Sequence, residues 1–251
     1  MMSKLIKTIL VVSLLMAGSA FADPIVYPST VTFNSIVGSY GTWQATVGSP
    51  GIQIAAFYYT GGSWQHATLF GRNQAPNDVG VGICNPGETA NCGTGQGGGD
   101  YNEISNNINP EVIRITLPTG YMWRNVQVSS LDNNGGGGNE HGVLYASNSA
   151  TPLAPGVIGT QICTFANSGA QTCVRSGGDA EDPILTIGTG YQSSHYLYLE
   201  ARDWNLPTNR NNDFLLRAVT VTTTVPEPGT WVLLGSGMLG MAGTVRRRFK
   251  K

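Results

Sequence analysis

Apolar and polar residues alternate with a period of two along several short runs in the middle of the chain. In Val112–Leu117, Ile113 and Ile115 fall on one face and Arg114 on the other, and His195–Arg202 alternates in the same way. This alternation is typical of strands with one buried and one solvated face. Further runs that predict strands are Val31–Val37, Ile52–Tyr59, Val126–Leu131, Val143–Ser147, Val157–Phe165, Pro183–Ile187 and Phe214–Val225.

Clusters of Gly, Asn and Pro separate these runs, for example Gly97–Asp100, Asn133–Asn139 and Leu206–Asn212. Such clusters mark turns and loops. No stretch of 12 residues between the two ends of the chain gives the apolar spacing of a capped helix. Many short strands with turn-rich spacers predict an all-β fold, an antiparallel β-sandwich of jelly-roll type. The absence of a fixed-period repeat argues against a solenoid or propeller.

Residues 1–22 have the pattern of a secretory signal peptide. Two lysines precede the apolar run Ile9–Ala17, and Ala20 and Ala22 form a small-x-small cleavage site before Asp23. The alternative, an N-terminal core helix, would need one apolar face, whereas this run is apolar all round. The pattern predicts export by the Sec machinery and removal of the segment by signal peptidase.

The C-terminal segment, residues 225–251, has three parts. Pro226-Glu227-Pro228 is followed by the uncharged, mostly apolar stretch Gly229–Val245 and then by a basic end. As a helix, the 16 residues from Thr230 would span about 24 Å, and snorkelling cationic side chains can make up the deficit to a membrane core. Basic residues favour the cytoplasmic side, so the C-terminus is expected there. These residues are Arg246, Arg247, Arg248, Lys250 and Lys251.

This three-part tail resembles the PEP-CTERM sorting signal of exported Gram-negative bacterial proteins. The resemblance implies recognition and cleavage near Pro226, Glu227 and Pro228 by exosortase, a membrane transpeptidase-like cysteine protease. It also implies a producer that makes an exopolysaccharide or biofilm matrix. A transient inner-membrane anchor, followed by release to the cell surface or the extracellular space, would result. An ordinary single-pass anchor would explain the apolar run and the arginines but not the Pro-Glu-Pro.

The predicted domain, residues 23–224, differs in charge from the two ends. Between Asp23 and Pro226 the chain has 14 acidic residues, seven arginines and no lysine, which gives a net charge of −7. A negative body repels nucleic acid and can attract divalent cations. We therefore expect no nucleic-acid partner, and the missing lysines exclude Schiff-base chemistry in this domain.

The four cysteines form two close pairs in the sequence, Cys84 with Cys92 and Cys163 with Cys173. Their spacers of seven and nine residues are longer than those of zinc sites, and export favours disulfides. Three connectivities are open, and sequence proximity favours the two local bridges. Each would close a loop of about 10 residues, worth roughly 2.5–3 kcal/mol.

Catalytic motifs are missing from the sequence. The three histidines are far apart, and neither a Gly-x-Ser-x-Gly elbow nor a phosphate-binding Gly-rich loop occurs. Glycoside hydrolysis needs two facing carboxylates, and the sequence cannot pair the candidates. No cofactor is expected apart from calcium, for which Asp100 and Glu103 supply hard oxygen ligands. A solvated acidic loop is the simpler alternative.

Aromatic residues give a second route to function. Trp64 and Trp204 lie among polar and small residues and are candidates for stacking on sugar rings; core packing is the alternative. The sequence thus predicts an exported, exosortase-processed surface or matrix protein whose β-sandwich body is not an enzyme. Two other hypotheses stay open: a carbohydrate-binding module for exopolysaccharide, and a secreted glycan hydrolase.

Overall fold

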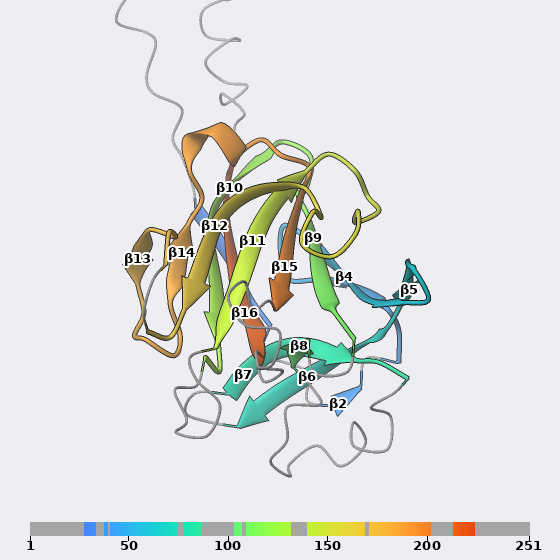
Figure 1. Cartoon of the computed structure of the whole chain (residues 1–251). Helices are drawn as coiled ribbons and strands as arrows, with labels where there is room; N and C mark the ends of the chain where they lie inside the picture. The colour runs from blue at the N-terminus through green and yellow to red at the C-terminus, as the bar shows by residue number, and fades with distance from the viewer. Residues whose placement is uncertain are drawn as a thin grey trace, which may run out of the picture. The chain divides into compact units, whose positions relative to one another are not determined.

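The computed structural model describes residues 28–33, 38–39, 41–74, 78–86, 103–106, 109–131, 140–168, 171–201 and 213–223 (Figure 1). Contacts group Pro28–Thr222 into one compact unit, which is the body discussed below. The described residues form antiparallel strands and one 3₁₀ turn, Thr189–Tyr191, without an α-helix. The all-β class predicted from the sequence is confirmed.

The described strands make two antiparallel sheets. Sheet A has the order β13-β14-β10-β16-β7-β6-β2, with β1 and β8 also paired to β16; sheet B has the order β12-β11-β15-β9-β4-β3, with β5 paired to β4. The strands of sheet A are β1 (Pro28–Thr32), β2 (Gly38–Ser39), β6 (Thr68–Gln74), β7 (Asp78–Cys84), β8 (Ile104–Ser105), β10 (Tyr121–Ser129), β13 (Arg175–Gly177), β14 (Ile184–Thr186) and β16 (Asp213–Thr223). The strands of sheet B are β3 (Gln44–Val47), β4 (Ile52–Thr60), β5 (Ser63–His66), β9 (Glu111–Thr116), β11 (His141–Ser147), β12 (Thr160–Ala166) and β15 (Tyr196–Ala201).

One hydrophobic core is shared by the inner faces of both sheets. Sheet B contributes alternate residues of its strands, such as Ile113 and Leu199, and sheet A contributes Val126 and Val219. Trp123 is fully buried in this core, and its indole donates a hydrogen bond of 2.7 Å to the carbonyl of Ser194. The alternation seen in the sequence therefore assigns the inner faces correctly.

The expectation of a solvated outer face is wrong for the central strands of sheet B. Residues 111–115 of β9 are all buried, including Arg114, which the alternation places on the polar face. Residues 197–201 of β15 are buried as well. The physical reason is a second hydrophobic cluster on the outer face, which contains Phe57 and Tyr145. A segment between β11 and β12 covers this cluster and is described in the next subsection.

Strands β6 and β7 were not predicted, because glycine and polar residues interrupt their apolar pattern. Figure 1 shows them crossing the lower end of the other strands. One glycine that interrupts the apolar pattern of β7 is Gly80, and packing requires it. A Cβ at this position would lie 2.6 Å from the carbonyl oxygen of Leu216 in β16. Only glycine permits this approach of two backbones.

Candidate ligand-binding face

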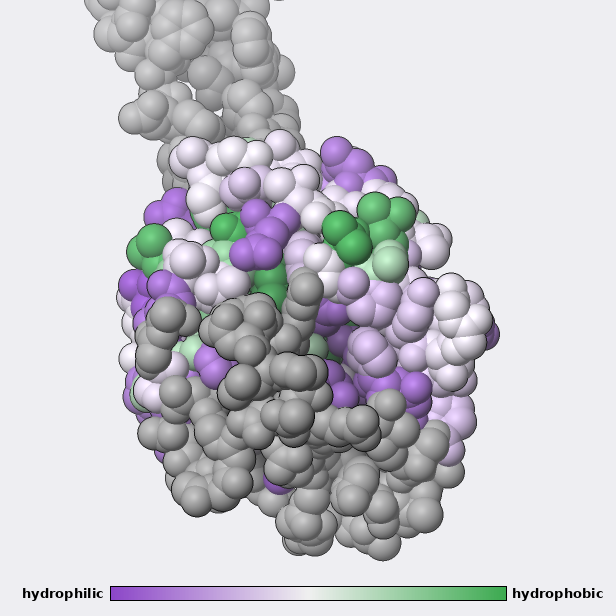
Figure 2. Space-filling model, viewed as in Figure 1, coloured by the Kyte–Doolittle hydropathy of each residue, from purple (hydrophilic) through white to green (hydrophobic). Residues whose placement is uncertain are grey.

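The outer face of sheet B is covered by residues 148–156, which we call the strap. Figure 1 shows this segment, olive in colour, looping beside β9 and β15 between β11 and β12. Most of the strap is exposed to solvent, and Pro152 is its buried residue. Leu153 is 60% exposed, and Figure 2 shows apolar surface in this region of the molecule. The strap is therefore attached to the sheet mainly by polar contacts.

Side chains of sheet B bind the main chain of the strap. Arg114, Tyr198 and Trp64 each donate a hydrogen bond to a strap carbonyl, and Glu200 accepts one from a strap amide. The contacts are Arg114 Nη1 to Ala150 O, Tyr198 Oη to Ser149 O at 2.7 Å, Trp64 Nε1 to Leu153 O, and Gly156 N to Glu200 Oε1 at 3.0 Å. Three donors and one acceptor thus point outward from one face of the sheet.

Arg114 lies between two aromatic rings of neighbouring strands. The centre of its guanidinium is 5.4 Å from the ring centroid of Phe57 and 5.2 Å from that of Tyr196. Such cation–π contacts hold the planar group in one orientation. Burial raises the pKa of the Tyr198 hydroxyl, although Arg114 opposes the shift. Tyr198 is therefore a neutral hydrogen-bond donor at physiological pH.

The rings extend this arrangement into a row across β15, β9, β4 and β5. Beyond Phe57, the ring of His66 lies at 5.5 Å and stacks on Trp43 at 3.7 Å, with 7° between the planes. At the other end His195 meets Tyr196 edge-on at 4.4 Å. Trp43 and Tyr196 are half-buried and His66 is exposed. We call these five side chains, Trp43, His66, Phe57, Tyr196 and His195, the aromatic row; the rings of Trp43, His66 and Tyr196 are at least partly accessible to solvent.

Trp64, the one predicted stacking residue that the structure describes, lies on β5 rather than in a loop. It is half-buried, and its ring meets Tyr59 edge-on at 5.2 Å. The other predicted residue, Trp204, lies outside the described residues. Sequence reasoning missed Arg114, because an arginine alternating with isoleucines fits an ordinary solvated face. The tyrosines at 196 and 198 on the neighbouring strand were the available signal.

Glu103, predicted as a calcium ligand, is buried instead of lying on a solvated loop. It pairs with Arg72 of β6 and accepts a hydrogen bond of 2.8 Å from Ser130, whose φ is +64°. Burial, and next the carboxyl group of Asp213, raise the pKa of Glu103 well above its usual value, while Arg72 and Ser130 oppose this shift. The described residues contain no group of three metal-ligating side chains. Asp100 lies outside them, so calcium binding stays a prediction.

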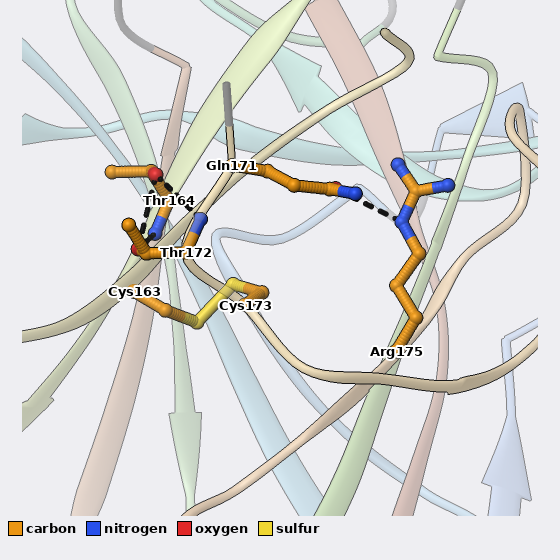
Figure 3. The surroundings of a disulfide bond; sticks show 6 residues. All are labelled: Cys163, Thr164, Gln171, Thr172, Cys173 and Arg175. Atoms are coloured by element: carbon orange, nitrogen blue, oxygen red, sulfur yellow. Dashed lines mark hydrogen bonds between the residues drawn. A yellow bond between two sulfur atoms is a disulfide. The ribbon is translucent and has the colours of Figure 1, made fainter. Parts of the chain in front are cut away.

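The predicted bridge between Cys163 and Cys173 is confirmed (Figure 3). It closes a loop in which Thr164 and Thr172 exchange hydrogen bonds through their backbone and hydroxyl groups. Cys84 is also disulfide-bonded, and its predicted partner Cys92 lies outside the described residues. The bridge between Cys163 and Cys173 links β12 to the segment before β13.

The predicted processing residues lie outside the described part of the chain. They are Ala20, Ala22, Pro226, Glu227, Pro228, Arg246, Arg247 and Arg248. Within the described residues, no helix has the length and apolar character to cross a membrane. The predicted C-terminal helix lies outside these residues.

Comparison with known proteins identifies the C-terminal segment. The body belongs to the class of all-β chains with two antiparallel sheets. Residues 224–248 match the family of the PEP-CTERM protein-sorting motif. The chain therefore carries a PEP-CTERM sorting motif, as its sequence predicts, and the motif implies export and processing by exosortase.

The whole chain is distantly similar to one solved structure. None of the curated proteins matches the sequence. The chain is similar to the crystal structure of a DUF4465 family protein from Bacteroides caccae ATCC 43185, with 13% identity and a TM-score of 0.37. The alignment covers 78% of this chain and 93% of that one. A likeness this distant carries no argument about function.

Proposed function

We propose that this protein is exported, anchored for a short time by its C-terminal segment with the C-terminus in the cytoplasm, and released by exosortase to the cell surface or a biofilm matrix. The observation that carries the proposal is the PEP-CTERM motif at residues 224–248. Its Pro-Glu-Pro is suited to a protease because each proline keeps the preceding residue extended. The partners are exosortase, signal peptidase and the Sec machinery.

Replacing Pro226→Ala and Pro228→Ala together is expected to block this processing. The uncut form should accumulate in the membrane fraction of the producing cell, because the altered segment no longer enters the protease in an extended conformation. Immunoblotting of membrane and released fractions measures the effect. Pro207→Ala is the matched control, since it changes a proline far from the motif. Normal release of the double variant would contradict the proposal.

We propose for the body a jelly-roll sandwich without catalytic activity. Taken in chain order, β7, β9, β10, β11, β12, β14, β15 and β16 form the runs β14-β10-β16-β7 and β12-β11-β15-β9. This arrangement supports the eight-stranded jelly roll. Two of the described buried carboxylates have structural partners, which supports a non-catalytic body: Glu103 pairs with Arg72, and Glu111 binds Asn85 and the backbone of Ser105.

A second candidate function is binding of the producer's exopolysaccharide by the outer face of sheet B. The aromatic row favours it, because ring faces of Trp and Tyr offer apolar surface next to polar tips. The hydrogen-bonding side chains beneath the strap add the polar groups that orient a ligand.

Trp64→Ala is expected to abolish retardation of the protein in affinity electrophoresis with matrix polysaccharide, because it removes both the ring and a donor on this face. Trp204→Ala tests the other predicted stacking residue. Tyr121→Ala, on β10 of the opposite sheet, is the matched aromatic control and should leave the retardation unchanged. An unchanged mobility of the wild-type protein in the polysaccharide gel would rule out this function.

A further inference from the structure

We propose that Arg114 binds the carboxylate of an acidic saccharide, and that the strap occupies this place in the ligand-free protein. The inference rests on the glycan-binding function proposed above and names its ligand class. The site consists of Arg114, Tyr198, Trp64 and Glu200 with the aromatic row around them. The observations that carry it are the charge of Arg114, the orientation of its guanidinium and the chemistry of the groups that the strap covers.

The charge of Arg114 has no carboxylate partner among the described residues. The residue is only 8% exposed, and neither of the two ion pairs between described residues includes it. The atom Nε is buried without a hydrogen-bond partner. An isolated buried cation is costly, so it is normally paired. A ligand carboxylate would supply the missing counter-ion and a partner for Nε.

The rings fix the guanidinium in a geometry that suits a carboxylate. Phe57 and Tyr196 lie at similar distances from its centre, 5.4 and 5.2 Å. Its edges, where the N–H groups point, are therefore left for hydrogen bonds. The fork of N–H groups in arginine matches the two oxygens of a carboxylate, which a lysine ammonium does not.

The strap presents to this face the same kind of atoms that a saccharide would present. Carbonyl oxygens of the strap accept hydrogen bonds from Arg114, Tyr198 and Trp64. Hydroxyl and carboxylate oxygens of a saccharide can accept the same bonds, and a hydroxyl can donate to Glu200 in place of the Gly156 amide. The strap is thus a competitor whose polar contacts a ligand can replace one for one.

The position of the strap allows such a replacement. Residues 148–151, 153 and 154 are exposed, and Pro152 is the buried anchor of the segment. Few buried apolar contacts favour low-energy local opening. The apparent affinity for a ligand is then reduced by the fraction of molecules in which the strap is closed.

The experiment compares hexagalacturonate with its methyl ester, which has the same sugar rings without charge. Binding is measured by tryptophan fluorescence on the full chain in detergent at 0.15 M salt, where screening over about 8 Å weakens repulsion by the acidic body. The wild-type protein is expected to bind the acid about tenfold more tightly than the ester, because hydrogen bonds to a charged group are lost in the ester. Equal affinities would overturn the carboxylate assignment and leave glycan binding in place.

Two variants test the residues. Arg114→Lys should bring the ratio between acid and ester close to one, whereas Arg124→Lys, an exposed arginine on β10, should leave it unchanged. Trp64→Phe keeps a ring but removes a donor that bonds the strap in the free protein and a saccharide oxygen in the complex, so it should leave the ratio between acid and ester unchanged. Thermal unfolding verifies that each variant is folded. The comparison of acid and ester in the wild-type protein tests the carboxylate assignment even if a variant fails to fold. Absence of binding to both sugars, in Trp64→Phe as well, would contradict the glycan function itself.

Discussion

Gly142→Ala is expected to lower the free energy of unfolding of the body by about 3 kcal/mol, the upper end of the usual cost of overpacking. A Cβ at this position would lie 2.8 Å from Cε1 of Phe214 and closer still to the ring of Phe165. These two rings are fully buried and meet edge-on at 5.0 Å. Neither ring can move without displacing the shared core, because protein interiors are close-packed.

Thermal unfolding measures the effect of Gly142→Ala as a decrease in Tm of roughly 6–12 °C. Gly190→Ala is the matched control, since a Cβ at Gly190 meets nothing within 4 Å. A second change, Phe165→Leu in the Gly142→Ala background, should restore part of the loss by making room. If the variants at 142 and 190 unfold at the same temperature, the described packing around Phe165 and Phe214 is wrong.

Arg72→Met is expected to cost about 3–5 kcal/mol at pH 8, the range for breaking a buried ion pair. The side chains of Arg72 and Glu103 are 11% and 4% exposed, so water cannot replace the lost partner. The change leaves Glu103 buried, with the carboxyl group of Asp213 still raising its pKa. Two neighbouring buried carboxyl groups cannot both be ionised without a large cost in free energy.

The cost of Arg72→Met should depend on pH with a definite sign. The pKa of Glu103 in the folded protein is above its usual value, so Glu103 favours folding at low pH, and this contribution is lost as the pH rises through the folded-state pKa. Removing Arg72 removes a group that lowers this pKa. The variant should therefore be closer to the wild-type protein at pH 5 than at pH 8, as measured by urea unfolding.

Two further variants control for this prediction. Arg217→Met breaks the ion pair with Asp182. The side chain of Arg217 is 30% exposed and that of Asp182 10%, so this change should cost less than Arg72→Met. Glu103→Gln in the Arg72→Met background should recover stability at pH 8 by removing the buried negative charge. A cost of Arg72→Met that is equal at both pH values would show that Glu103 does not titrate as described.

Local patterns explain what the sequence could predict. The alternation in β9 and β15 depends only on neighbouring residues, so it gave the strands and their inner faces. The bridge from Cys163 to Cys173 spans 10 residues, and proximity was enough to favour it. The sorting motif is a contiguous segment and needs no fold to be recognised.

Long-range contacts explain what the sequence could not predict. The ion pair between Arg72 and Glu103 joins residues 31 apart, and Trp64 meets Leu153 across 89 residues. Burial of Arg114 depends on the strap, which comes 34 or more residues later in the chain. Alternation alone cannot tell a solvated outer face from one that a loop covers. Tertiary packing makes that difference.

If exosortase removes the C-terminal segment, as we propose, the intact mass of the released protein reveals where the chain is cut. The released protein is expected to begin near Asp23, to end close to Pro226-Glu227-Pro228 and to lack Trp231–Lys251. A released, water-soluble protein that begins near Asp23 and still ends at Lys251 would contradict this proposal.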